Sequence, residues 1–267
     1  MTGLRYVYAV CRPFDAALPL QDRLTGVAGA PPELLAHRGL IAVVSTVPEE
    51  EFAEESLRRR MEDLDWLTAT ARAHQAVIDA LTAVTTPLPL RLATVFRDDS
   101  GVRGMMEESE DDFRRALDRL DGRVEWGVKV YLEKADAADE GTDSSSAASA
   151  TTGRDYLRQR RRLARTNEDR WQSAEAFAGE LHRTLSGRAE DHRLHAPQNS
   201  ALSGAAGQNV LNAAYLVPRE DSEQFVELVD WTKSDAPGTT LGLRVELTGP
   251  WAVYSFTAGI GETEEDA

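Results

Sequence analysis

The sequence predicts an α+β fold with two domains, the C-terminal one a modified ferredoxin-like (βαββαβ) fold. Strand-like segments, alternating or rich in β-branched residues, are interleaved with segments whose apolar residues recur at helical spacing. After the turn signal Asp121-Gly122 the predicted order is β, α, β, β, α, β, which is the split βαβ pattern. We therefore expect an N-terminal α+β domain over residues 1–120, which contains a long helix. A ferredoxin-like domain over 121–258 and an acidic tail over 259–267 follow it.

The N-terminal half combines strands with one dominant helix. Its strands are aromatic or β-branched and are each followed closely by a proline. Its long helix shows an apolar stripe at seven-residue spacing, and two prolines end it. The predicted elements are strands over 4–11 and 40–47, a long helix over 50–84, an extended stretch over 88–96 and a shorter helix over about 102–120. The pattern does not define the topology of this half.

The C-terminal half supplies the remaining elements. They are a strand with period-two alternation over 124–132, a helix over 157–185, a weak strand over 192–196, a strand over 210–217, a helix over 219–233 and a strand over 241–248. Residues 134–153 are built almost wholly from Ala, Ser, Thr, Asp and Gly, which cannot bury enough apolar surface to offset their ordering entropy. We expect a mobile loop there, inside the ferredoxin-like domain.

The charge and cysteine content restrict the partners and the compartment. The formal net charge of −15 opposes broad attraction to nucleic acid or anionic lipid. Cys11 is the only cysteine, so no disulfide can form within the chain, and a reducing compartment fits. The start of the sequence has no secretory-signal pattern, and no apolar run reaches the length needed to span a bilayer. We expect a cytoplasmic protein that does not enter membranes.

No motif points to catalysis or to a cofactor. The chain contains neither Gly-Lys-Ser/Thr nor Gly-x-Ser-x-Gly. Cys11 ends a predicted strand and is interpreted as a small buried thiol. His192 and His195, with His182 upstream, are better interpreted as surface histidines than as metal ligands. His74 lies on the apolar stripe of the long helix, where a hydrogen-bonded core or interface histidine is expected.

Two groups of residues are candidates for binding another protein. Arg158, Arg162 and Arg165 share one helix face and form either a solvated face paired with nearby carboxylates, which we favour, or a docking strip for an acidic surface or RNA. RNA recognition on such a sheet uses exposed stacking aromatics, which are scarce here. The second group follows the last strand and forms either a lid on the core, which we favour, or a contact surface; its members are Trp251, Tyr254 and Phe256.

Several motifs, in this order and spacing, resemble those of the gas vesicle protein GvpF/GvpL family over nearly the whole chain. They are Tyr6-Val7-Tyr8, His74, Pro89-Leu90-Arg91 with Thr94-Val95-Phe96, Glu125-Trp126-Gly127-Val128-Lys129-Val130, Gly153-Arg154-Asp155-Tyr156-Leu157, Asn212-Ala213-Ala214-Tyr215-Leu216-Val217, and Leu247-Thr248-Gly249-Pro250-Trp251 with Tyr254-Ser255-Phe256. The chain departs from the family pattern at Leu92-Ala93, where Phe-Gly is usual, and at Ala252-Val253, where a proline pair is usual.

The resemblance implies an accessory or minor protein of gas vesicle assembly. Such a protein is expected in the cytoplasm, associated with gas vesicles, without enzymatic activity, and in contact with the hydrophobic shell protein GvpA and other accessory Gvp proteins. It also implies two α+β domains, the second ferredoxin-like with a variable region. The alternative function is a regulatory nucleic-acid-binding protein that uses the arginine strip, which the net charge disfavours.

Overall fold

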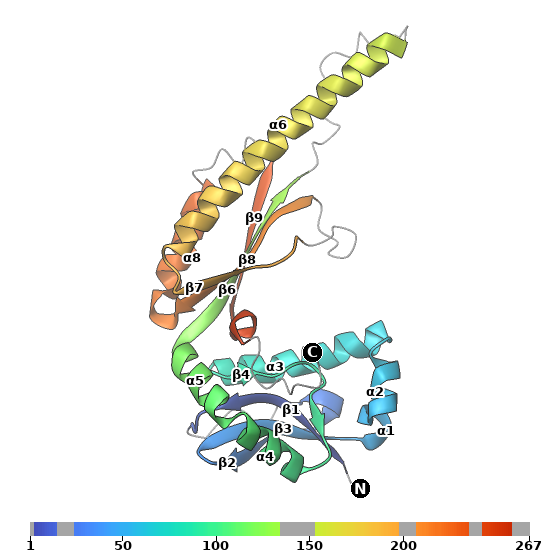
Figure 1. The fold of residues 1–267 in the computed structure, drawn as a ribbon, viewed down its shortest axis with the longest axis vertical. Helices are drawn as coiled ribbons and strands as arrows, with labels where there is room; N and C mark the ends of the chain where they lie inside the picture. The colour runs from blue at the N-terminus through green and yellow to red at the C-terminus, as the bar shows by residue number, and fades with distance from the viewer. Residues whose placement is uncertain (1–2, 15–23, 134–152, 198–206, 235–241, 258–267) are drawn as a thin grey trace. The chain divides into compact units, whose positions relative to one another are not determined.

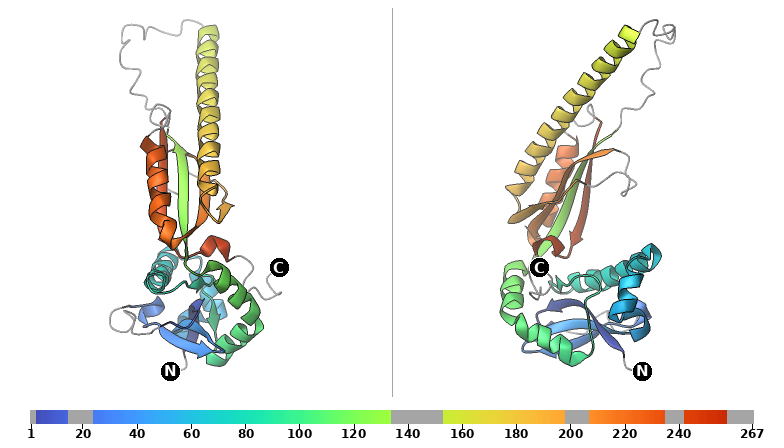
Figure 2. Two further views of the ribbon diagram at one scale, coloured as in Figure 1. Left: turned by 90° about the vertical axis from the view of Figure 1, so that its left-hand side faces the viewer. Right: turned by 45° about the vertical axis from the view of Figure 1, so that its right-hand side comes forward.

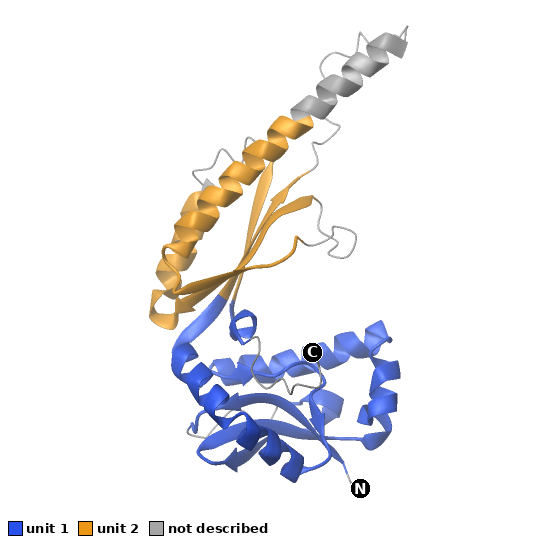
Figure 3. Cartoon of the chain, viewed as in Figure 1, with its two compact units in different colours: residues 1–125, 250–267 blue, residues 126–249 orange. Residues whose placement is uncertain are grey.

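The computed structural model describes residues 3–14, 24–133, 153–197, 207–234 and 242–257, with side chains described from residue 167 onward in the helix that begins at 153. The expected acidic tail and all but the last residue of the expected mobile loop lie outside these ranges. The chain divides into two compact units, residues 1–125 with 250–267 and residues 126–249 (Figure 3). Each unit combines a β-sheet with helices, which confirms the α+β class.

The sheet of the first unit is antiparallel, with the N-terminal strand at its centre. The strand order is β2-β3-β1-β4, and β5 also pairs with β1. Its strands are β1 (Leu4–Cys11), β2 (Glu33–His37), β3 (Leu40–Val47), β4 (Leu88–Pro89) and β5 (Val95–Phe96). A register shift between Val7 and Ala9 marks a bulge, which allows Tyr6, Tyr8, Ala9 and Cys11 to enter the same core cluster despite their unequal spacing.

The prediction of one long helix over 50–84 is wrong. The chain forms α1 (Glu49–Phe52), α2 (Glu54–Arg60) and α3 (Leu64–Thr82) instead. Ala53 has an extended backbone (φ −63°, ψ 148°), which interrupts the helix after one turn. Asp63 then caps α3 by accepting hydrogen bonds from the amides of Asp65 and Trp66. Of the expected apolar stripe, His74, Ile78 and Leu81 are buried on α3, which packs along one face of the sheet (Figure 1). Leu57 lies on α2 and packs against the same core, whereas Leu64 is 75% exposed, so the prediction was wrong for that residue.

The shorter predicted helix is also divided. Ser109, with φ −108° and ψ 17°, separates α4 (Asp99–Glu108) from α5 (Glu110–Leu120). Both helices contact the sheet, and their apolar residues Val102, Met106, Phe113 and Leu117 are buried. A 3-10 turn, η1 (Val27–Gly29), lies between β1 and β2 and contacts α3 and β3.

The second unit contains a four-stranded sheet in the order β7-β8-β6-β9. Its elements are β6 (Arg123–Leu132), α6 (Gly153–Ser186), β7 (Asp191–Leu194), β8 (Gln208–Pro218), η2 (Arg219–Asp221), α8 (Ser222–Ser234) and β9 (Leu243–Trp251). Their sequence along the chain confirms the predicted β, α, β, β, α, β order. Both long helices cover the same face of the sheet (Figure 2). Leu181, Leu185, Phe225 and Val229 bury their side chains from these helices.

The last described segment belongs to the first unit, whereas we expected it in the second domain. After β9 the chain forms η3 (Tyr254–Phe256), and the unit boundary falls at residues 249 and 250. Ala252 is part of the first unit's core cluster, and Val253 and Phe256 are buried. The long-range packing of these small and aromatic side chains assigns the segment to the first unit. Among the described helices, none is long and apolar enough to cross a membrane.

Candidate functional site

A buried tyrosine–histidine pair joins the central strand of the first unit to α3. The Tyr6 hydroxyl accepts a hydrogen bond from the Ala93 amide (3.1 Å) and is also hydrogen-bonded to His74 Nδ1 (2.9 Å). Burial lowers the pKa of His74 to about 4, so the imidazole is neutral. His74 is 4% exposed, and this confirms the expectation of a hydrogen-bonded core histidine. The pair therefore stabilises the fold and does not form an accessible general base.

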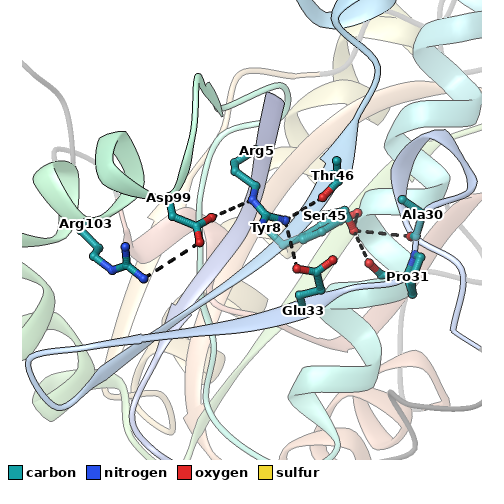
Figure 4. Close-up of polar contacts among 9 residues, drawn as sticks. All are labelled: Arg5, Tyr8, Ala30, Pro31, Glu33, Ser45, Thr46, Asp99 and Arg103. Atoms are coloured by element: carbon teal, nitrogen blue, oxygen red, sulfur yellow. Dashed lines mark hydrogen bonds and ion pairs between the residues drawn. The ribbon is translucent and has the colours of Figure 1, made fainter. Parts of the chain in front are cut away.

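A second tyrosine holds the loop before β2 against the sheet. The Tyr8 hydroxyl accepts from the Val27 amide (2.8 Å) and donates to Ser45 Oγ (2.9 Å). Ser45 in turn donates to the Pro31 carbonyl (3.0 Å), as Figure 4 shows. A Cβ added to Gly26 would lie 2.2 Å from the Tyr8 hydroxyl, so this loop approaches the sheet too closely for a side chain there. The hydroxyl groups of Tyr8 and Ser45 are therefore engaged in hydrogen bonds that hold the fold together.

Arg5 organises the polar surface of the same sheet. Its guanidinium contacts Asp99 (2.7 Å), Glu33 (3.0 Å) and Thr46 (2.6 Å), which belong to α4, β2 and β3 (Figure 4). Arg103 lies 4.0 Å from Asp99 and extends the network. Because each charge faces an opposite one, the cluster fixes the helix on the sheet and offers no unpaired cation to an anionic ligand.

The C-terminal segment is anchored on Glu125, which is only 9% exposed. The Glu125 carboxylate accepts hydrogen bonds from the Ser255 amide (2.8 Å) and the Ser255 hydroxyl (2.7 Å). Tyr254 donates from its hydroxyl to Gln75 Oε1 (3.2 Å), which ties the segment to α3. The two contacts to the Glu125 carboxylate are charge-assisted and part-buried, and such hydrogen bonds are stronger than neutral ones.

The three aromatic residues of this segment differ in exposure. Phe256 is buried, Tyr254 is half-buried against the core cluster, and Trp251 is 39% exposed. The first two therefore have a covering and anchoring role, and Trp251 is the member with surface free to contact a partner. A contact role for the group stays a prediction.

The three arginines of the predicted strip lie on α6, but their side chains are outside the described part of the chain. The continuous helix places Arg158, Arg162 and Arg165 on one face by register. Among the α6 residues whose side chains are described, none from 167 to 173 is buried and Ala174 is the first that is. The sheet therefore packs on the C-terminal part of the described helix.

The remaining sequence candidates have no catalytic geometry. Cys11 is fully buried, and burial raises the pKa of its thiol to about 12, so the thiolate is not available. His192 and His195 are exposed, as expected, and His182 is half-buried with its Nδ1 2.8 Å from the Tyr215 hydroxyl. Within the described ranges, no group of three or more His, Cys, Asp or Glu residues could hold a metal ion.

Sequence reasoning missed two of the anchors described above. Glu125 is one of many carboxylates and lies in an alternating strand, where a polar residue normally faces water. Tyr215 lies within an apolar strand pattern, and nothing in that pattern indicates its hydrogen bond with His182, which is 33 residues away. Only the tertiary structure brings these groups to their partners.

Comparison with known proteins identifies the family. The family model described as gas vesicle synthesis protein GvpL/GvpF matches residues 4–258. The chain belongs to the GvpL/GvpF family. It is 55% identical to gas vesicle protein L of Streptomyces sp. (strain CB03234) over 98% of this chain and 95% of that protein. It is 27% identical to gas vesicle protein F of the same organism, over 94% of this chain and 98% of that protein.

A solved structure has the same fold. The crystal structure of the gas vesicle protein GvpF from Anabaena sp. PCC7120 superposes with a TM-score of 0.64, covering 96% of this chain and 98% of that one. The sequence identity is 18%, so the likeness concerns the fold alone. The family, with the resemblance seen in the sequence, associates this GvpL/GvpF member with gas vesicle assembly.

Proposed function

We propose that the protein is a non-enzymatic accessory factor of gas vesicle assembly that binds the hydrophobic shell protein GvpA and other Gvp proteins in the cytoplasm. The observation that carries this proposal is the family match over residues 4–258. A shell subunit exposes a large apolar surface before assembly, and such surfaces aggregate in water. An accessory protein that covers this surface would deliver the subunit to a growing vesicle.

The architecture of the second unit supports a binding role. We infer that this unit is ferredoxin-like, because its elements follow the order β, α, β, β, α, β and its strands the order β7-β8-β6-β9. Both helices cover one face of the sheet (Figure 2), and the strand order makes β7 and β9 its two edges. We further propose that the expected loop over 134–153 is the variable region of this ferredoxin-like domain.

The proposed contact residues come from two places in the chain. Arg158, Arg162 and Arg165 present a basic helix face that suits an acidic partner surface. Trp251 presents an exposed indole on the segment that Glu125 anchors. Tyr254 and Phe256 hold the same segment against the core.

An aggregation assay tests the proposal. Shell protein is diluted out of denaturant into buffer with increasing amounts of the purified protein, and light scattering is followed. We expect scattering to be suppressed at near-stoichiometric ratios. Scattering that is unchanged at a large excess of the protein would exclude the proposed binding.

Tryptophan variants locate the contact in the same assay. Trp251→Ala should weaken suppression, because large exposed aromatics dominate protein contacts. Trp231→Ala is the matched control, since Trp231 is 63% exposed on α8, outside the proposed contact. Equal suppression by both variants would remove Trp251 from the contact surface.

A further inference from the structure

The strand β9 forms one edge of the four-stranded sheet. It is nine residues long, and the side chains of residues 243–247 are half-buried. The opposite edge strand, β7, has four residues, of which three are polar or charged and three are exposed. Short, charged edge strands resist pairing with another chain, whereas long edge strands with apolar residues favour it. The two edges of this sheet therefore differ in their capacity to recruit a further strand.

Contacts with β6 define which groups of β9 face outward. The Gly242 carbonyl accepts from the Glu133 amide (2.9 Å), and the Arg244 guanidinium lies 4.6 Å from the centre of the Tyr131 ring. Thr248 contacts Gly127, so positions rise along β9 as they fall along β6. Because Gly242 directs its carbonyl to β6, the alternate residues 243, 245 and 247 direct their N–H and C=O groups to the outer edge.

The outward edge has a self-complementary sequence. Residues 243–247 read Leu-Arg-Val-Glu-Leu, with Val245 at the centre. When this segment pairs antiparallel with an identical segment, Arg244 lies opposite Glu246 of the second copy. Leu243 then lies opposite Leu247 of the second copy, on the other face of the strand. A two-fold axis through Val245 repeats each of these pairs.

We propose that two copies of the protein associate through antiparallel pairing of their β9 strands, which joins their two sheets across a two-fold axis. Val245 and its counterpart exchange two backbone hydrogen bonds at the axis. Pairing ends at Gly249, because its positive φ of 130° interrupts the extended strand geometry on the outward edge. This association is independent of the proposed shell-protein binding.

The charged pair is already present within one copy. Arg244 contacts both Glu246 and Glu133, and the side chains of Arg244 and Glu246 are 34% and 38% exposed. Both side chains therefore have an oppositely charged partner in the isolated copy. The folded monomer does not lose stability through an unpaired buried charge. In the dimer, each arginine gains the glutamate directly opposite in addition to its own neighbours.

Charge reversal in the full-length chain tests the pairing by sedimentation equilibrium. The wild type should form dimers. Glu246→Arg and Arg244→Glu should each weaken association by about tenfold or more, because each places like charges opposite at two symmetric positions. An equal mixture of the two variants should recover the dimer, since every arginine then faces a glutamate. The matched control is Arg193→Glu on β7, which should leave the dimer unchanged.

A disulfide experiment gives an independent reading. Val245→Cys should form a cross-linked dimer on mild oxidation, because the pair at the axis lies about 5.5 Å apart between Cα atoms. Leu243→Cys should not, since its counterpart lies several residues away. Cys11 is fully buried and does not interfere. A wild type that stays monomeric at its highest attainable concentration would overturn the proposal, as would failure of the mixture to dimerise or equal cross-linking of both cysteine variants.

Discussion

Each unit of the protein ties a helix to a central strand with one histidine–tyrosine hydrogen bond. In the first unit His74 Nδ1 lies 2.9 Å from the Tyr6 hydroxyl, and in the second His182 Nδ1 lies 2.8 Å from the Tyr215 hydroxyl. The first pair is sealed in the core, with His74 4% exposed. In the second pair His182 is half-buried and its ring lies 4.9 Å from that of His192, which is exposed.

The difference in burial determines how much each histidine–tyrosine pair contributes to the stability of its unit. A buried group that loses its partner keeps the full desolvation penalty, whereas a half-buried group can turn to water. Burial lowers the pKa of both histidines, and His192 adds to the lowering at His182. The first unit therefore depends on its polar core as a rigid scaffold, and the second unit tolerates more change at the equivalent place.

Tyr6→Phe should have the largest effect on stability. The variant leaves the buried His74 Nδ1 without its partner, which costs about 3 kcal/mol, and the part-buried Ala93 amide without its acceptor, which costs about 1 kcal/mol. We expect the free energy of unfolding of the first unit to fall by about 4 kcal/mol. Hydrogen exchange of the β1 amides measures this locally. If the free energy of unfolding fell by less than about 1 kcal/mol, the Tyr6–His74 pair would not be shielded from water as the structure indicates.

Acid should weaken the first unit through His74. Its pKa is about 4 in the folded protein and 6.5 in an ordinary setting, so the unfolded chain takes up the proton first as the pH falls. The stabilising contribution is complete above pH 6.5 and declines until the pH reaches about 4, a loss of about 3 kcal/mol.

Denaturant unfolding across this pH window measures the decline. His74→Gln should flatten it, because the amide cannot take up a proton in this range. His182→Gln is the matched control and should leave most of the slope in place, since His182 is half-buried. A slope that is the same in His74→Gln as in the wild type would assign the pH dependence to other groups.

Tyr215→Phe should have the smallest effect of the three. Ser186 Oγ lies 3.4 Å from His182 Nδ1, and the ring is open to water, so the histidine can replace its lost partner. We expect a loss of about 1 kcal/mol, measured by hydrogen exchange of the β8 amides. A loss as large as that of Tyr6→Phe would show that the two pairs are equivalent after all.

Local patterns were sufficient to predict most of the elements but not their contacts. The strands over 4–11 and 40–47 were predicted with their observed bounds, since their composition and the following prolines define them. The strand β2 was missed because Glu33–His37 has no strand-like alternation and forms by pairing with β3. The break at Ala53 was missed because alanine is a strong helix former and nothing local signals the extended backbone there.

The anchors of the candidate site depend on residues far apart in the chain. Tyr6 and His74 are 68 positions apart, and Ser255 and Glu125 are 130 apart. A periodic pattern could place His74 on a buried stripe, as it did, but could not name its partner. The return of residues 250–257 to the first unit has the same origin, because only tertiary packing selects between two available cores.

We propose that this GvpL/GvpF member takes part in gas vesicle assembly by binding other Gvp proteins. Deletion of its gene in a vesicle-forming cell, followed by electron microscopy and a buoyancy measurement, tests the claim most directly. We expect vesicles to be lost after the deletion and to be restored by the wild-type chain supplied in trans. Normal vesicle number and buoyancy after the deletion would contradict it.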